Sequence, residues 1–338
     1  MMQTGLFDCQ QRFDQLDKAG DPLIQLNAII DWEAFRPSLE TLRQKERKST
    51  AGRKPYDAVL MFKITVLRSL YNLAFEAIEF QIRDRLSFMR FLGLTVSDHV
   101  PDEIPIWLFE DQLAKAGLVE TLFNQFEVFL RDNGFAARKG QIVDASIIAV
   151  PRQRNSRDEN AQIKNGETPE DWPVNKRRQK DTDAQWTKKN GKNYYGYKNH
   201  MSVDVKDKFV RAFEVTPASV HDSHVFEELL DEKNSSKDVW ADSAYRSDSS
   251  LKMLADGGFR EHVQRKGTRH RKLSAREQRG NRSRSRTRSR VEHVFDVQTM
   301  MIGDMVIRAI GQVRVRAMIG MRNLVYNLNR YRLLAGTA

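Results

Sequence analysis

The sequence GQIVDASIIAV (residues 140–150) is a short apolar run, rich in β-branched residues and interrupted by one acid, Asp144. Because β-branched side chains pack well on a pleated surface, this run predicts a buried strand. An ionised carboxylate inside such a strand costs several kcal/mol unless another group compensates it. The stretch therefore predicts the start of a sheet and, within it, a candidate functional position.

The chain that follows alternates between strand-like and helix-like patterns, which is typical of an α/β domain. Two strands joined by a KDK turn come first, and single strands and helices then alternate, so we expect a mixed sheet flanked by helices. The predicted elements are strands at 195–205 and 209–218, a helix from His221 to about Glu232, a strand at 238–245, a helix at 251–258, a strand at 259–263 and a helix containing VEHVFD (291–296).

The chain before residue 136 has the periodicity of helices and not of strands. In PYDAVLMFKITVLRSLYNL (55–73), Leu60, Ile64, Leu67 and Leu70 recur at helical spacing, and later stretches end in glycine, as at Gly93. We expect an all-helical domain at 1–135, which is either a helix-turn-helix-like DNA-binding module or a plain helical bundle. The sheet and its helices then form a second domain at 136–338.

Two segments of this second domain depart from the alternating pattern. Residues 152–192 are polar and charged with few apolar anchors, and we expect a flexible excursion there. Near the C-terminus, Val315, Ile319, Leu324 and Leu328 share one face, which predicts a long amphipathic helix.

The composition predicts a soluble protein of a reducing compartment. Of the 338 residues, 40% are hydrophobic, and Cys9 is the single cysteine, so no intramolecular disulfide can form. The N-terminus lacks a basic segment followed by an apolar one, and no apolar run approaches the roughly 20 residues that span a bilayer. We expect a cytoplasmic location and no membrane partner.

The positive charge is concentrated in one segment. The net charge is +11, and residues 265–290 contain twelve Lys and Arg against one acid, Glu277, while the rest of the chain balances. A concentrated positive patch favours a polyanion, most often nucleic acid, over a small-molecule substrate. The alternative is a disordered, solvated basic loop.

Three acids form a candidate catalytic set. Asp144 interrupts its strand, Asp242 ends the strand DVWAD, and Glu292 lies on a helix whose neighbours Val291 and Val294 suggest that it faces partly inward. Each alone is more often a helix cap or an ion-pair partner. Together, converging carboxylates suit Mg²⁺, and two such ions about 3.5–4 Å apart support phosphoryl transfer.

These motifs resemble the DDE transposases of bacterial insertion sequences, specifically insertion-sequence family five. The resemblance runs through nearly the whole chain, in the same order. It is carried by residues 55–73, EFQIRDRLSFMRFLGL (79–94), VPDE (100–103), IVDASIIAVPRQRN (142–155), KNYYGYKNHMSVD (192–204), VHDSHVFEELL (220–230), VWADSAYRS (239–247), LSAREQRGNRSRSR (273–286) and RVEHVFD (290–296).

The resemblance implies an RNase H-like catalytic domain with Asp144, Asp242 and Glu292 as catalytic and metal-binding residues. It implies Mg²⁺, with Mn²⁺ as a substitute and two ions in the site. The implied activity is binding of terminal inverted repeats followed by cleavage and strand transfer on double-stranded element ends and target DNA. Because two ends must be held together, a homodimer is expected.

Two positions depart from the family signature. Arg288 occupies the arginine position before the glutamate, but Ser285 stands where a tyrosine is usual and Thr299 where a lysine is usual. An alternative is therefore a catalytically inactive, transposase-derived DNA-binding protein. A further alternative is a nuclease that cuts without joining.

The remaining candidates concern DNA contacts. The KNYYGYK stretch mixes aromatics with positive charge, which suits stacking on bases and contact with phosphates, although ordinary half-buried tyrosines are the alternative. His221 and His224 have an HxxH spacing, but no further ligand pattern supports zinc. The predicted DNA-binding residues are Lys192, Tyr195, Lys198, Arg282, Arg284, Arg286, Arg288 and Arg290.

Overall fold

The chain consists of two compact units, one helical and one built on a sheet. A computed structural model describes residues 8–43, 54–189, 191–302 and 307–336. The first unit comprises residues 1–125 and 324–338, and the second comprises residues 126–323. This division falls within two helices, whereas the sequence predicts a boundary between residues 135 and 136.

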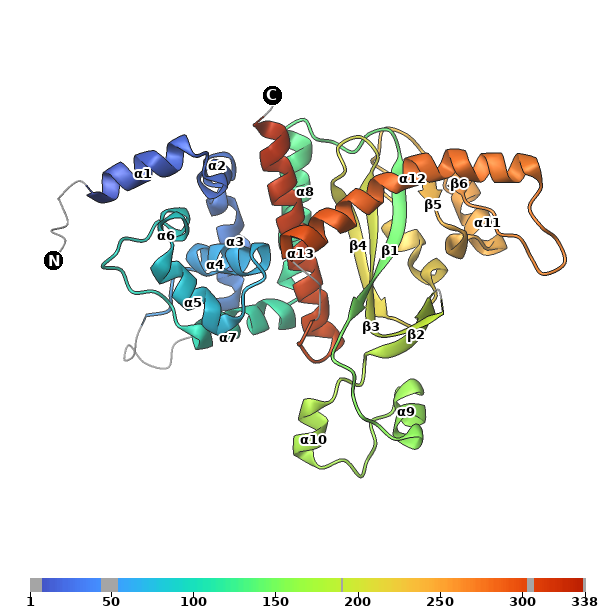
Figure 1. Cartoon of the computed structure of the whole chain (residues 1–338), viewed down its shortest axis with the longest axis horizontal. Helices are drawn as coiled ribbons and strands as arrows, with labels where there is room; N and C mark the ends of the chain where they lie inside the picture. The colour runs from blue at the N-terminus through green and yellow to red at the C-terminus, as the bar shows by residue number, and fades with distance from the viewer. Residues whose placement is uncertain (1–7, 44–53, 190, 303–306, 337–338) are drawn as a thin grey trace. The chain divides into compact units, whose positions relative to one another are not determined.

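The helical unit confirms the predicted helical character of the N-terminal region across its described residues (Figure 1). Asp57 begins the central helix by accepting a hydrogen bond from the Leu60 amide, and Gly93 ends a later helix with a positive φ of 72°. The elements are α1 (Asp8–Lys18), α2 (Pro22–Ile29), η1 (Trp32–Phe35), α3 (Arg36–Glu40), η2 (Thr41–Arg43), α4 (Ala58–Leu70), α5 (Phe75–Asp84), α6 (Leu86–Leu92), α7 (Glu103–Lys115) and α8 (Leu118–Asp132).

Helix α4 forms the core of this unit. Phe62, Ile64 and Leu67 are fully buried, and the helix contacts α3, α5, α6 and α7. Arg68 near its end forms a part-buried ion pair with Glu110 of α7, so this acid holds the fold together. No single helix among the described residues is long and apolar enough to cross a membrane; α4 and α5 pass that test only as a pair bent by 104°.

The second unit is built on a six-stranded mixed sheet in the order β2–β3–β1–β5–β6, with β4 beside β3 (Figure 1). Strand β3 is antiparallel to β1, β2 and β4, whereas β5 and β6 run parallel to β1. This confirms the predicted RNase H-like mixed sheet. The strands are β1 (Gln141–Ala149), β2 (Gln185–Lys189), β3 (Lys192–Asp204), β4 (Val210–Pro217), β5 (Asp238–Ala241) and β6 (Arg260–Val263).

The sheet is buried on both faces. Val143 belongs to a core cluster with Phe226 and Leu254 on one face, and Ile148 belongs to a cluster with Ile319 on the other. Side chains alternate along a strand, so Asp144 shares its face with Ile148. The covering helices of the unit are α11 (Asp248–Asp256), α12 (Ala275–Ile302) and α13 (Gln312–Ala335).

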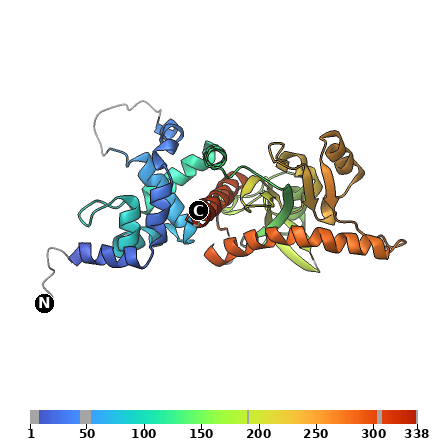
Figure 2. The ribbon, with the colours of Figure 1, turned by 90° about the horizontal axis from the view of Figure 1, so that it is seen from above.

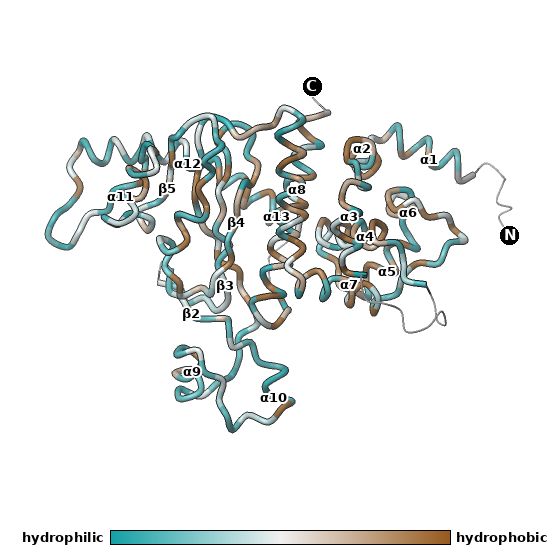
Figure 3. The backbone as a smooth tube through the Cα atoms, turned by 180° about the vertical axis from the view of Figure 1, so that it is seen from behind, coloured by the Kyte–Doolittle hydropathy of each residue, from teal (hydrophilic) through white to brown (hydrophobic). Residues whose placement is uncertain are grey.

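Helix α12 contacts β1 and β5 and lies along one side of the sheet, as the view from above shows (Figure 2). Figure 3 shows much of this helix as hydrophilic. The predicted apolar face of the C-terminal helix is confirmed, because Val315, Ile319, Leu324 and Leu328 are all fully buried.

One of two predictions about the connections is wrong. The excursion predicted at 152–192 lies between β1 and β3 and contains α9 (Arg157–Lys164), α10 (Val174–Gln179) and β2. Its core is small, since Ile163 and Trp172 are buried and the Trp172 indole donates to Glu159 at 2.6 Å. The helix expected from His221 to Glu232 is two 3-10 turns, η3 (Asp222–Val225) and η4 (Glu227–Leu229). Leu230 turns to an extended conformation after η4, which ends the helical path.

A buried ionic network ties α8 to the sheet. Arg211 of β4 is buried, and its guanidinium donates to Asp204 at 2.9 Å, to Glu127 at 2.8 Å and to the Phe135 carbonyl at 2.7 Å. Two buried carboxylates thus share one buried cation, and among the described residues its removal leaves Asp204 without a cation and Glu127 with only Arg131 at 3.4 Å.

We therefore predict that Arg211→Met lowers the free energy of unfolding of this unit by about 3–5 kcal/mol. Urea denaturation followed by hydrogen exchange of the β3 and β4 amides measures this unit alone. Arg131→Met is the matched control, because Arg131 lies 3.4 Å from the same Glu127 but is half-buried. That change is expected to cost less than about 1 kcal/mol, and equal losses in the two variants would contradict the network's role.

Candidate active site

The sheet register places Asp144 beside Asp242. Strands β1 and β5 are parallel, and Val143 pairs with Ala241. The next residue on each strand line is an aspartate, and neighbouring strands lie about 4.8 Å apart. Two carboxylates that are almost one hundred residues apart in sequence therefore meet at one point on the sheet.

Asp144 is a half-buried carboxylate that forms an ion pair with one cation. Its Oδ1 accepts from the Ala145 amide at 2.9 Å, and its Oδ2 accepts from the Arg288 guanidinium of α12 at 3.0 Å. Burial raises the pKa of Asp144 to about 6, against the opposing attraction of Arg288, and the charge of Asp242 adds to the rise. Ionisation of Asp144 is therefore unfavourable, and a further cation would stabilise it.

Asp242 occupies the end of its strand. It caps the short turn η5 (Ser243–Tyr245) by accepting a hydrogen bond from the Ala244 amide at 2.7 Å. Only one oxygen of the carboxylate is used in this cap, which leaves the other oxygen for a ligand. Its place follows a general rule for α/β sheets, in which ligands collect where strands end.

Glu292 lies on α12, but the expectation that it faces partly inward is wrong. Its side chain is exposed, because Val291 and Val294 on either side are fully buried and take the inward direction. Glu292 follows Arg288 by four residues, so the two side chains lie on the same side of the helix. The structure thus places Glu292 on the side of α12 from which Arg288 reaches Asp144.

The arginines of α12 divide into two groups. Arg284 and Arg288 are half-buried, whereas Arg282, Arg286 and Arg290 are exposed. Arg290 also donates to the Val205 carbonyl at 2.8 Å. The helix therefore uses part of its positive charge within the fold and offers the rest to solvent.

The two signature departures have different surroundings. Ser285 accepts a hydrogen bond from Gln264 at 2.7 Å, and Gln264 directly follows β6. The serine thus fixes α12 to the end of β6. Thr299 is exposed near the end of α12.

The KNYYGYK stretch is less available for DNA than the sequence predicts. Lys192 is exposed, but Tyr195 is buried and donates its hydroxyl hydrogen to the Asp181 carbonyl at 3.1 Å. Lys198 is 13% exposed and pairs with Asp222 at 2.7 Å. These contacts favour a structural role for Tyr195 and Lys198, which was the alternative for this stretch. Gly196 is required here, since a Cβ would lie 2.2 Å from the Ile148 carbonyl oxygen.

A buried polar group beside the two aspartates has no signal in the sequence pattern. Tyr245 is fully buried, and burial together with the charges of Asp222, Asp144 and Asp242 raises its pKa well above 10. Its hydroxyl lies 3.5 Å from Nδ1 of His200, a buried histidine where a surface residue is the usual expectation. The motif WADSAYRS contains this tyrosine, but only the fold shows that it points back toward the acids.

A basic pocket opens close to Asp242. Its volume is about 320 Å³, and Arg246, the residue after η5, lines it. Glu277 organises it by accepting from Arg265 at 3.3 Å and from Arg271 at 2.9 Å. The cationic residues that line it are Arg246, Arg265, Lys266, Arg271 and Lys272.

The histidine pair does not form a metal site with other groups. His221 caps η3 through Nδ1, and the rings of His221 and His224 are 6.2 Å apart. Within the described ranges, no three His, Cys, Asp or Glu side chains are grouped closely enough to hold a metal ion together. The structure therefore brings Asp144 and Asp242 together but does not group the exposed Glu292 with them.

Comparison with known proteins identifies the family. A family model described as "Transposase DDE domain" matches residues 136–328, and one described as "Transposase domain (DUF772)" matches residues 11–112. A cryo-EM structure of the piggyBac transposase synaptic complex with hairpin DNA is similar at 11% identity and a TM-score of 0.47, covering 94% of this chain and 75% of that one. The first match spans more than half of the chain, which therefore belongs to the transposase DDE domain family.

Proposed function

We propose that this protein binds the terminal inverted repeats of an insertion sequence, cleaves DNA at those ends and joins them to target DNA. The observation that carries the proposal is the β1–β5 register, which sets Asp144 beside Asp242 with Arg288 on Asp144. Asp204 and Glu127 share Arg211 through direct hydrogen bonds to both carboxylates. Arg288 instead bonds Asp144, while Asp242 accepts from a backbone amide, an arrangement that favours a further cation.

The residues present fit a divalent metal ion. Asp144 and Asp242 supply hard carboxylate oxygens, the ligand type that Mg²⁺ and Mn²⁺ prefer. The raised pKa of Asp144, caused first by burial, indicates that its negative charge lacks full compensation. We propose that these two residues hold the metal and that Glu292 supplies the third carboxylate, with room for two ions.

The residues of this chain position the reacting groups. When bound, the metal ions activate an attacking oxygen and stabilise the leaving oxygen in phosphoryl transfer. Arg288 keeps Asp144 ionised and oriented, and the cap at η5 fixes one oxygen of Asp242. Because attack by water and by a DNA 3′-hydroxyl are both in-line displacements at phosphorus, one site serves cleavage and then joining.

The basic surface supports DNA as the substrate. The exposed arginines of α12 and the basic pocket at Arg246 both lie in the unit that contains the aspartates. Phosphate contacts of this kind supply affinity and position without reading sequence. We propose that they hold the DNA backbone on either side of the cut, and that a homodimer brings two ends together.

We predict that Asp144→Asn, Asp242→Asn and Glu292→Gln each lower DNA cleavage on the order of a thousandfold, because each removes a negatively charged metal ligand. The assay is nicking of a plasmid that carries the DNA flanking this gene, with Mg²⁺ or Mn²⁺. A gel-shift assay in parallel should show DNA binding by the variants similar to that of the parent. Asp256→Asn, an exposed aspartate of α11, is the control and should cleave normally.

Three outcomes would contradict parts of the proposal. Full activity of Glu292→Gln would remove Glu292 from the site, and the exposure of this side chain makes it the sharpest test. DNA binding without any metal-dependent cleavage by the parent protein would favour the inactive DNA-binding alternative. Cleavage without transfer of the 3′ end would favour a plain nuclease.

We also predict that Asp144→Asn stabilises the metal-free protein at pH 7.5 but not at pH 5. The folded-state pKa of Asp144 is raised from 3.8 to about 6, so above pH 6 the fold bears the cost of an ionised, half-buried carboxylate. Below both values Asp144 is protonated in the folded and unfolded states, and the gain disappears. The gain at pH 7.5 is up to about 3 kcal/mol, measured by thermal or urea denaturation.

Added Mg²⁺ provides the second half of this experiment. At pH 7.5 it should raise the melting temperature of the parent protein and of Asp256→Asn, and have little effect on Asp144→Asn. An equal Mg²⁺ effect on all three proteins would place the metal elsewhere. A stability gain for Asp144→Asn that is the same at pH 5 and pH 7.5 would contradict the electrostatic explanation.

A further inference from the structure

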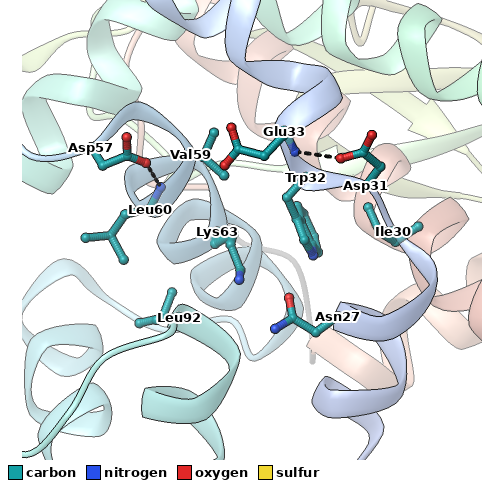
Figure 4. A pocket seen from close by; sticks show the side chains of 10 residues that line it. All are labelled: Asn27, Ile30, Asp31, Trp32, Glu33, Asp57, Val59, Leu60, Lys63 and Leu92. Atoms are coloured by element: carbon teal, nitrogen blue, oxygen red, sulfur yellow. Dashed lines mark hydrogen bonds between the residues drawn. The ribbon is translucent and has the colours of Figure 1, made fainter.

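The helical unit contains a cavity in which two interior polar atoms have no hydrogen-bond partner among the described residues. Its volume is about 380 Å³, within the range of small-ligand sites. Figure 4 shows Lys63 of α4 pointing into it, with Asn27 opposite and Trp32 beside them. The residues that line it are Asn27, Ile30, Asp31, Trp32, Glu33, Asp57, Val59, Leu60, Lys63 and Leu92.

Lys63 is a buried cation that the charge of Glu33 attracts from a distance, without a direct ion pair among the described residues. Its side chain belongs to a residue that is 8% exposed, and its ammonium lies 4.7 Å from the Phe91 ring centre and 5.6 Å from that of Trp32. Within the described part of the chain, no ion pair or hydrogen bond to this ammonium is present. Burial lowers the pKa of Lys63 to about 8, which shows how poorly the fold solvates the charge. The aromatic faces compensate only part of that cost.

Two neighbours are also unsatisfied. The Trp32 indole Nε1 and the Asn27 Oδ1 are buried without a hydrogen-bond partner, and Trp32 is 7% exposed. A buried polar atom without a partner costs free energy, so natural folds rarely keep two beside an unpaired lysine. The floor of the cavity therefore has unused capacity for hydrogen bonds: Lys63 and the Trp32 indole require acceptor atoms on a ligand, and Asn27 Oδ1 requires a donor.

The rim of the cavity has the opposite charge. Glu33 and Asp57 both accept from Arg36, Asp57 also accepts from the Leu60 amide, and Asp31 caps η1 through the Glu33 amide. Among the described residues, three carboxylates line the cavity against Lys63 and the neighbouring Arg36, so this part of the lining is net negative. A phosphate group or another strong anion would be repelled at the entrance. The ligand must present acceptors to the donors of the floor, and donors without negative charge to the rim.

We propose that this cavity binds a nucleobase. A base is planar and uncharged, with ring nitrogen or carbonyl acceptors on one edge for Lys63 and amino or imino donors on another for the rim carboxylates. Trp32 and the aliphatic walls formed by Ile30, Leu60 and Leu92 suit its flat faces. The base is a free nucleoside or one turned out of a DNA strand, and only the second source rests on the proposed function.

The first experiment needs no DNA. Saturation-transfer NMR on the full chain, with each of the four deoxynucleosides as probe, should show binding of at least one. Lys63→Met should weaken that binding about tenfold or more, because it removes a charged hydrogen-bond donor. Methionine keeps the length and the aromatic contacts, so this variant should fold and melt no lower than the parent at pH 7. Lys18→Met, at an exposed lysine of α1, is the matched control and should bind like the parent.

Specific results would overturn the nucleobase assignment. These are binding of inorganic phosphate but of no deoxynucleoside, or nucleoside binding that Lys63→Met leaves unchanged. Trp32→Phe gives an independent test, because phenylalanine keeps an aromatic side chain and lacks the unpartnered indole N–H. It should weaken binding less than Lys63→Met does. If Trp32→Phe loses all binding and also melts at a lower temperature, the loss is structural. The Lys63→Met result then decides whether the cavity binds a base.

The second experiment identifies the source of the base. The probes are duplexes from the DNA flanking the gene, each with 2-aminopurine at a single position. At one position the 2-aminopurine fluorescence should increase when the parent protein binds. It should not increase when Lys63→Met binds. Nucleoside binding without any such position would assign the cavity to a free nucleoside. Asp242→Asn should behave like the parent in both experiments. Failure of cleavage and failure of this inference are thereby distinguishable.

Discussion

One electrostatic constraint organises the sheet-containing unit: a carboxylate half-buried in its first strand must be compensated from elsewhere in the chain. Asp144 receives that compensation from Arg288, which is 144 residues away in sequence. The contact requires α12 to lie across β1 and β5, and the interaction of Ser285 with Gln264 fixes the helix against the end of β6. The arrangement of helix and sheet thus follows from where one negative charge is placed.

The same constraint explains why the two aspartates are not an accident of packing. A second carboxylate next to the first raises the free energy of the folded state. A neutral residue such as serine or asparagine could cap η5 in place of Asp242. Asp204 and Glu127 show the other solution, in which buried acids surround a buried arginine with short hydrogen bonds and the network is closed. At Asp144 and Asp242 the network is left open on one side. A cation bound between the two carboxylates would complete this network.

Much of this could be predicted from the sequence, for physical reasons that are specific to each element. The run at 140–150 predicts a strand because apolar, β-branched side chains can bury both faces, and the C-terminal helix is predictable because Val315 and Ile319 lie on one face. Asp144 and Asp242 were identifiable since each is an acid in an apolar strand. The parallel pairing that brings them together is a long-range property, which no local pattern contains.

The sequence predicts less where side-chain direction or a sparse core decides the structure. Glu292 has apolar neighbours, but they are adjacent residues, and in a helix adjacent side chains point about 100° apart. The polar excursion folds around Trp172 and Ile163, too few residues to produce a periodic signal. The DNA-contact prediction for Tyr195, which lies between Lys192 and Lys198 in sequence, stays a prediction, although its hydroxyl donates to the Asp181 carbonyl.

Arg211 and Lys63, two of the buried cations in the described part of the chain, differ in the partners that surround them. Arg211 has every contact that its guanidinium needs, and its removal is a matter of stability alone. Lys63 has aromatic rings beside it and no acceptor among the described residues, while Arg36 holds the nearest acids at the rim. A fold that needed only to fill this space would be better served by an apolar side chain. The lysine is therefore best explained by something that enters the cavity, as the paired aspartates are by a metal.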